Sequence, residues 1–320
     1  MKLFVIGNGF DIGHNLPTAY WDFRNFLERT QPVFLQQFEE KYNIYPNMND
    51  DQIKDLLWNT FESNLASIDE DSIIDMGVSI DMDLESGDMG IEDTLYQYFS
   101  EEYDYINKLS VYLKRWIRTI KIRDTLPRTS LIKQTSGDVF LSFNYTVVLE
   151  TVYKINEGNV IHIHGSLREY TDDPIIGHGN KNRIDSIQEK ISKAEILFDE
   201  KWSSICRSVK DYYLGTFKDI DKYSYKLSKL GDANIDEVIV VGHSLDGVDM
   251  PYFEKVDILT GGDKKWTVYY YREDEKDAKR DNLLKTGIDR SRIELRSSTE
   301  FYDLNDAEME RKAFEIKYGF

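Results

Sequence analysis

The chain contains short apolar runs, rich in β-branched and aromatic residues, that end in glycine or in polar residues. The first is the run 3–6, Leu-Phe-Val-Ile, which stops at Gly7-Asn8-Gly9. Runs of this length bounded by turn residues are typical of buried strands. The same pattern predicts five further strands, at 139–143, 160–163, 237–241, 266–271 and 293–295.

Most of these runs are separated by stretches in which apolar residues recur at helical spacing. Such stretches lie at 146–154, 184–229, 273–284 and 305–317. Strands that alternate with helices favour an α/β fold. We therefore expect a Rossmann-like, mostly parallel sheet with helices on both faces.

Residues 17–125 carry no convincing strand and predict a large helical insertion within a single domain spanning 1–320. Helical spacing recurs there at 20–28, 32–42, 51–65 and 95–122. Inside it, residues 69–93 hold ten acidic residues and no Lys or Arg. This composition predicts a solvated or mobile segment, and ordering against a partner is the alternative.

The composition excludes several classes of protein. The net charge is −18 over 320 residues, which argues against a nucleic-acid partner but not against a single nucleotide. The single cysteine, Cys206, excludes an intrachain disulfide framework and a multi-cysteine zinc site. No signal peptide and no run of about 18 apolar residues is present, so we expect a cytoplasmic protein without a membrane contact.

The histidines indicate where the chemistry lies, because each stands in or beside a glycine-bearing segment. Three of these segments follow predicted strands, and in open α/β sheets ligands bind outside the carboxyl ends of the strands. The polar turns at those ends therefore predict one site. The five histidines are His14, His162, His164, His178 and His243.

The turn after the first strand, Gly7-Asn8-Gly9-Phe10, is a candidate for binding the phosphates of a nucleotide cofactor. Glycine allows a backbone to approach a phosphate closely. The third glycine of the dinucleotide fingerprint is missing, since position 12 is Ile12. A tight strand-to-helix turn without a ligand is the alternative.

Two residues after the next strands are candidates for catalysis. Asn144 follows the strand at 139–143, and it either caps a helix or orients a water or a ribose hydroxyl. His164 precedes Gly165 at the end of the strand 160–163, where it suits a general base. A hydrogen-bonded structural role is the alternative for His164 and, more strongly, for His162.

The fourth segment is the turn Gly242-His243-Ser244. It is not a lipase nucleophile elbow, because Asp246 holds the second glycine position and no histidine follows His243. We expect this turn to line a nucleotide pocket. Asp246 or Asp249 would hold a ribose hydroxyl or cap the next helix.

A catalytic metal is a further alternative, built from His162, His164 and His178 with Asp11. The Asp-x-His motif that opens a typical two-metal phosphoesterase is absent. We therefore expect no metal.

The order of these motifs resembles the AbiH family of bacterial abortive-infection proteins, which confer phage resistance. Residues 4–18, FVIGNGFDIGHNLPT, followed by YWDF at 20–23, closely resemble the family's opening. WNTFE at 58–62, FNYT at 143–146, IHG at 163–165, GHG at 177–179 and GHS at 242–244 then recur in the family's order.

AbiH proteins are similar in turn to the sirtuin-like superfamily, whose defence members commonly cleave NAD at the nicotinamide–ribose bond. That resemblance implies a sirtuin-like domain, NAD as substrate or ligand, and no deacetylation, because one cysteine cannot form the sirtuin zinc module. It places the phosphate turn at Gly7, Gly9 and Asp11, the nicotinamide ribose at Asn144, the catalytic histidine at His164, and the adenosine side at Gly242 and Ser244.

The leading hypothesis is accordingly an anti-phage NAD glycohydrolase. Asp11 would stabilise positive charge on the ribose, Asn144 would place a water and His164 would accept a proton. A nucleotide-sensing or partner-binding module without turnover, and a metal-assisted nucleotide or nucleic-acid hydrolase, are the alternatives. Because constant NAD loss would kill the host, we expect homo-oligomer assembly or a phage-derived trigger to complete the site, with 69–93 as a candidate gate.

Overall fold

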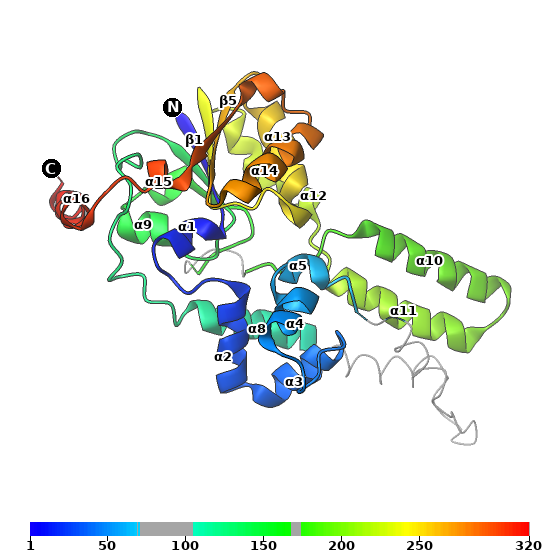
Figure 1. The fold of residues 1–320 in the computed structure, drawn as a ribbon. Coiled ribbons are helices and arrows are strands. Elements are labelled where there is room, and N and C mark those ends of the chain that lie inside the picture. Colours follow the sequence, from blue (N-terminus) through cyan, green and yellow to red (C-terminus); the bar gives the residue numbers. More distant parts are fainter. Residues whose placement is uncertain (69, 71–104, 168–173, 320) are drawn as a thin grey trace. The chain divides into compact units, whose positions relative to one another are not determined.

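The computed structural model describes residues 1–68, 70, 105–167 and 174–319 (Figure 1). The expectation for the acidic segment 69–93 lies outside the described residues, apart from Glu70. The chain divides into two compact units. Unit 1 comprises Met1–Asp22, Leu113–Ile175 and Asp219–Phe320, and unit 2 comprises Phe23–Tyr112 and Ile176–Lys218. The single domain with an insertion at 17–125 stays a prediction.

Unit 1 is built on one six-stranded sheet whose strand pairs are all parallel, as predicted. The order across the sheet is β3-β2-β1-β4-β5-β6. The strands lie within one or two residues of the predicted runs, because buried parallel strands are continuous apolar stretches. They are β1 (Lys2–Ile6), β2 (Val139–Ser142), β3 (Val160–His162), β4 (Glu237–Val241), β5 (Lys265–Tyr270) and β6 (Ile293–Ser297).

Both faces of the sheet are covered, because side chains alternate along each strand. In β1, Leu3 and Val5 belong to one core cluster, and Phe4 and Ile6 belong to the other. The first cluster includes residues of η3 (Ser224–Leu230), α13 (Met250–Leu259) and α14 (Lys276–Lys285). The second includes residues of α1 (Asn8–Gly13), α9 (Val148–Val152) and α15 (Ser298–Phe301). The Rossmann-like arrangement is thereby confirmed.

The remaining elements of unit 1 are short turns and two helices. They are η2 (Glu157–Asn159), α12 (Ile220–Tyr223), η4 (Gly247–Asp249), η5 (Glu273–Glu275), η6 (Arg290–Arg292) and α16 (Asp306–Tyr318). Two helices contain residues of both units, α2 (Tyr20–Thr30) and α8 (Tyr105–Ile117).

Unit 2 is helical in its described part, with a core of packed aromatic rings. Trp58 and Phe61 stack at 4.6 Å between ring centroids, and Phe23 and Phe38 meet them edge-on. The buried Glu39 carboxylate accepts hydrogen bonds from the Trp58 indole and from an arginine of α2. The elements are α3 (Pro32–Glu40), α4 (Asp50–Ile53), η1 (Lys54–Trp58), α5 (Phe61–Asn64), α10 (Lys181–Ile196) and α11 (Glu200–Gly215).

One of the predicted helical stretches is interrupted. The stretch 184–229 breaks at Phe198, whose φ of 55° is left-handed, and Asp199 then caps α11 by accepting a 2.9 Å hydrogen bond from the Trp202 N–H. Helices α10 and α11 consequently form a hairpin (Figure 1).

Among the described residues, no helix has the length and apolar character needed to span a membrane.

Candidate functional site

The carboxyl ends of four neighbouring strands, β3, β2, β1 and β4, lie level at one edge of the sheet. The parallel register pairs Ile6 with Ser142 on one side and with Val241 on the other, and Ser142 pairs in turn with His162. The residues that follow each strand therefore emerge next to one another. Parallel pairing thus places the predicted turns along a common edge, as the sequence analysis expected.

The turns after β1 and β4 pack backbone against backbone. The Gly9 N–H donates a 2.7 Å hydrogen bond to the Gly242 carbonyl. A Cβ on Gly7 would lie 2.5 Å from the His243 Cα, and a Cβ on Gly242 would lie 2.1 Å from the Phe10 nitrogen. Gly242 also has a left-handed φ of 71°. Close packing of these two turns is therefore one reason for their glycines.

The backbone N–H groups of the β1 turn are largely used within the protein. Gly7 donates to the Val241 carbonyl at 3.0 Å, and Phe10 donates to the Gly7 carbonyl at 2.9 Å. The Phe10 ring is buried in the core beside His14. The Asn8 amide donates to the carbonyl of Thr18 at 2.8 Å. The role of this turn in cofactor binding stays a prediction.

Asp11, on α1, is a buried carboxyl group with an unusual acidity. Burial raises its pKa to about 7, because a carboxylate loses hydration when it is removed from water. The Thr146 hydroxyl, which donates to Oδ2 at 2.5 Å, and the Asn144 amide both oppose this rise, while Glu150 adds to it. A carboxyl group with this pKa is close to half ionised at neutral pH.

The side chain of Asn144 is buried without a hydrogen-bond partner. It is 6% exposed, and neither its amide nitrogen nor its amide oxygen forms a hydrogen bond with any described residue. The amide approaches the Asp11 carboxyl closely enough to lower its pKa, but without hydrogen-bond geometry. Oδ1 of Asp11 likewise has no partner in the described part of the chain. Such unmet buried groups are rare and need an explanation.

The backbone of Asn144 is held by a buried pair of titratable residues. The Asn144 carbonyl accepts a 3.1 Å hydrogen bond from Nδ1 of His162, whose Nε2 lies 2.9 Å from Oε1 of Glu150. The Asn144 N–H donates to the Ser142 hydroxyl at 3.2 Å. His162 thus has the structural contacts that the alternative reading expected. Both ring nitrogens of His162 are therefore engaged by oxygen atoms of the protein.

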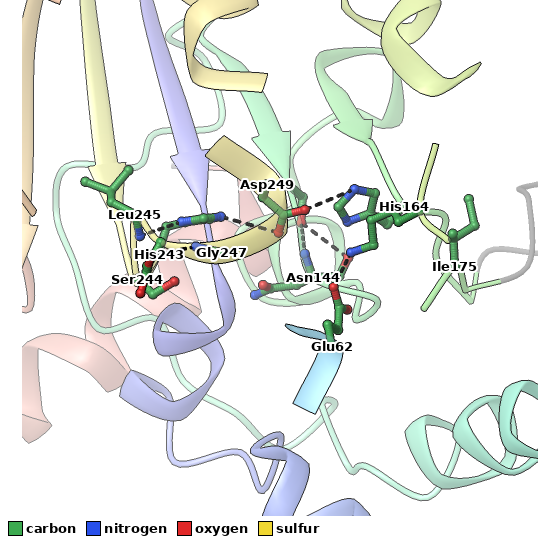
Figure 2. A network of polar contacts seen from close by, with 12 residues as sticks. Glu62, Asn144, His164, Ile175, His243, Ser244, Leu245, Gly247 and Asp249 are labelled. Carbon is green, nitrogen blue, oxygen red and sulfur yellow. Dashed lines mark hydrogen bonds and ion pairs between the residues drawn. The ribbon is translucent and has the colours of Figure 1, made fainter. Parts of the chain in front are cut away.

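His164 lies just beyond β3 and is 2% exposed. Its ring meets the rings of Phe143 and Tyr252, each with its centroid 5.4 Å away. Its Nε2 lies 3.5 Å from Oδ1 of Asp249, and Figure 2 shows these two side chains facing each other. An imidazole beside a carboxylate is a typical arrangement for a general base.

The residues of the turn after β4 that were predicted to line a nucleotide pocket differ in their exposure to solvent. His243 is buried, and Ser244 is exposed. Asp246 accepts a 2.7 Å hydrogen bond from the Gly247 N–H and caps η4, which is the capping role left open by the sequence. The buried ammonium of Lys279 donates to the carbonyls of His243 at 2.7 Å and of Ser244 at 3.3 Å. Lys279 therefore fixes the shape of this turn from α14.

The two remaining histidines have contacts of their own. His14 hydrogen-bonds the Phe10 carbonyl at 2.8 Å and the Tyr153 hydroxyl at 2.7 Å, and burial lowers its pKa to about 4. His178 belongs to unit 2, and burial lowers its pKa to about 4 as well. Among the described residues, no group of three or more His, Cys, Asp or Glu side chains could hold a metal ion.

Three residues of the site carried little signal in the sequence. Glu150 and Lys279 lie inside helical stretches, where charged residues are usually solvated. The sequence does not distinguish Asp249 from Asp246, since either could hold a ribose hydroxyl or cap the next helix. The backbone turn of η4 separates the two, since Asp246 caps this turn and Asp249 faces the histidines.

Comparisons with known proteins identify the family. The family model described as "Bacteriophage abortive infection AbiH" matches residues 3–270, which is most of the chain and includes every residue of the site except Lys279. Comparison with curated proteins gave no match. The chain therefore belongs to the AbiH family of bacteriophage abortive-infection proteins.

Proposed function

We propose that this anti-phage protein is an NAD glycohydrolase, which cleaves the bond between nicotinamide and ribose. The observation that carries the proposal is the buried, unpartnered amide of Asn144 beside the Asp11 carboxyl, whose pKa is about 7. An amide left without partners in the protein is available to a water or a ribose hydroxyl. The adjacent carboxyl group is ionised in about half of the molecules at neutral pH, and its carboxylate form can stabilise a positive charge.

The order of the strands supports a dinucleotide as the ligand. In an open sheet with the order 3-2-1-4-5-6, dinucleotides bind where the order reverses, outside the carboxyl ends of the strands. Here the reversal lies between β1 and β4, and Asp11 follows the first of these strands. The resemblance to the sirtuin-like superfamily favours NAD among dinucleotides.

The proposed reaction uses three side chains. The C–N glycosidic bond breaks and its electron pair leaves with nicotinamide, so positive charge develops on the ribose ring. The Asp11 carboxylate stabilises that charge. Asn144 orients a water whose oxygen bonds to the ribose carbon, and His164 accepts the proton that this water loses. General base catalysis of this kind contributes roughly 10²–10⁴-fold to a rate.

The remainder of NAD would lie along the turns after β1 and β4. Ser244 is exposed there and has a hydroxyl for a ribose or a phosphate. Most backbone N–H groups of the β1 turn already have partners in the protein. The contribution to NAD binding would therefore come from the shape of the backbone at Gly7, Asn8, Gly9 and Gly242. In this proposal the dinucleotide is the substrate, and no metal takes part.

The test is to incubate the purified protein with NAD, NADP and ATP and to separate the products by chromatography. The proposal expects nicotinamide and ADP-ribose in equal amounts from NAD, with activity retained after exhaustive treatment with EDTA. Calorimetric binding of NAD without release of nicotinamide would instead support the sensing module. Loss of activity with EDTA, restored by a divalent cation, would support the metal-assisted hydrolase.

A further inference from the structure

The carboxylate of Asp249 faces two histidines, one with each oxygen. Oδ1 lies 3.5 Å from Nε2 of His164, and Oδ2 lies 3.8 Å from Nε2 of His243 (Figure 2). The Asp249 side chain is 16% exposed, and the two imidazoles are almost fully buried. These are ion-pair distances rather than hydrogen-bond distances, and contacts of catalytic groups often tighten when substrate binds.

The tautomer of His243 is fixed by the backbone. The Leu245 N–H donates a 2.9 Å hydrogen bond to Nδ1 of His243, so that nitrogen carries a lone pair and no proton. The proton of the neutral ring therefore lies on Nε2, which faces Asp249. The rings of Phe143 and Phe253 pack against His243 with centroids 4.6 and 4.9 Å away. His243 thus presents a fixed N–H to the carboxylate.

Asp249 lies at the junction between η4 and α13. It occupies the N-cap position of α13, yet its side chain makes no capping hydrogen bond. An aspartate at this position usually caps the helix, so the departure sets Asp249 apart. The phenyl ring of Phe143 packs edge-on against both histidines, which holds the two imidazoles on either side of the carboxylate.

We propose that Asp249 is a positioning residue, which together with His243 orients the imidazole of His164 and stabilises its protonated form. In the proposed reaction, an O–H bond of water breaks and an N–H bond forms on His164. The ring becomes an imidazolium next to the Asp249 carboxylate, whose charge favours that form. The N–H of His243 faces the second oxygen of Asp249, and this electrostatic contact keeps the carboxylate in place. This inference rests on the proposed function for its catalytic role, but the contact itself does not.

The experiment compares the variant Asp249→Asn with Glu254→Gln, a matched loss of one carboxylate on the exposed side of α13. With only five histidines in the chain, the imidazole nitrogens of the full-length protein can be followed by ¹⁵N NMR after histidine labelling. We expect the signals of His164 and His243 to move in Asp249→Asn and to stay in place in Glu254→Gln. Unmoved signals of both histidines in folded Asp249→Asn would overturn the proposal.

Turnover of NAD gives the second readout. We expect kcat to fall by about 10- to 100-fold in Asp249→Asn with KM unchanged, as for a group that assists a general base without touching substrate. Asp249→Glu, which keeps the carboxylate, should recover part of kcat, and it serves if Asp249→Asn does not fold. A Glu variant as slow as the Asn variant, with its histidine signals at wild-type positions, would also contradict the role.

The two proposals fail separately. If the wild-type protein releases no nicotinamide from NAD, the proposed function is wrong, and the nitrogen spectra still decide whether Asp249 contacts both histidines. If nicotinamide is released and the spectra do not respond to Asp249→Asn, the proposed glycohydrolase function is supported and the proposed positioning role of Asp249 is wrong.

Discussion

The hydroxyl of Thr146 donates a 2.5 Å hydrogen bond to the buried carboxyl of Asp11, joining the loop after β2 to the helix after β1. This bond lowers the pKa of Asp11 against the larger effect of burial. We expect Thr146→Val to raise this pKa further above 7 and to destabilise the protein by about 1–3 kcal/mol, because a buried acceptor loses its partner. Carbon-13 NMR titration of the carboxyl group measures the first effect, and a pKa at or below the wild-type value would contradict it.

Asp11→Asn should change the pH dependence of stability. The folded pKa is raised from 3.8 to about 7, so between these values the folded state binds a proton that the unfolded state has lost. Wild-type stability therefore falls as pH rises from about 4 to 7, by up to about 4 kcal/mol relative to the variant. Urea denaturation of both proteins at several pH values checks this. A difference between them that does not vary with pH would refute the raised pKa.

The contact between the β1 and β4 turns predicts a strong effect of Gly242→Ala. The new methyl would meet the Phe10 nitrogen at 2.1 Å, and the φ of 71° is left-handed. We expect a loss of about 2–5 kcal/mol in the free energy of unfolding. Gly262→Ala is the matched control, because its φ of 72° is similar and nothing lies within 4 Å. It should cost about 1–2 kcal/mol from the backbone alone. Equal losses in both variants would show that the close approach is unimportant.

Lys279→Met should loosen the turn that carries His243. The buried ammonium donates to the carbonyls of His243 and Ser244, and burial lowers its pKa. Its removal leaves a buried carbonyl without a donor, for which we expect a loss of about 1–3 kcal/mol. Lys276→Met, one turn earlier at the start of α14, should change stability by less than about 0.5 kcal/mol. Thermal denaturation of the two variants compares these losses, and an equal loss in both would contradict the role of Lys279.

The fold was predictable because the buried strands of a parallel sheet appear in the sequence as continuous apolar runs that end in turn residues. Those same runs located Asn144, His164 and His243, since each follows a strand directly. The length of the break between α10 and α11 was not predictable, because it depends on one left-handed residue, Phe198.

The contacts within the site were less predictable than its location. The pKa of Asp11 follows from burial, which arises only when α1 packs against the loop after β2. Asp246 and Asp249 are alike in sequence, and only the backbone of η4 directs one to a cap and the other to the histidines. The pairing of Glu150 with His162 likewise joins two elements whose spacing the sequence does not reveal.

The most direct test of the account is the release of nicotinamide from NAD by the wild-type protein, Asn144→Ala and Asn305→Ala. Asn305, another asparagine of unit 1, uses its side chain to cap α16. The account predicts release by the wild-type protein and by Asn305→Ala, and a loss of about 100-fold or more for a folded Asn144→Ala. Equal release by all three proteins, or none by the wild-type protein, would contradict it.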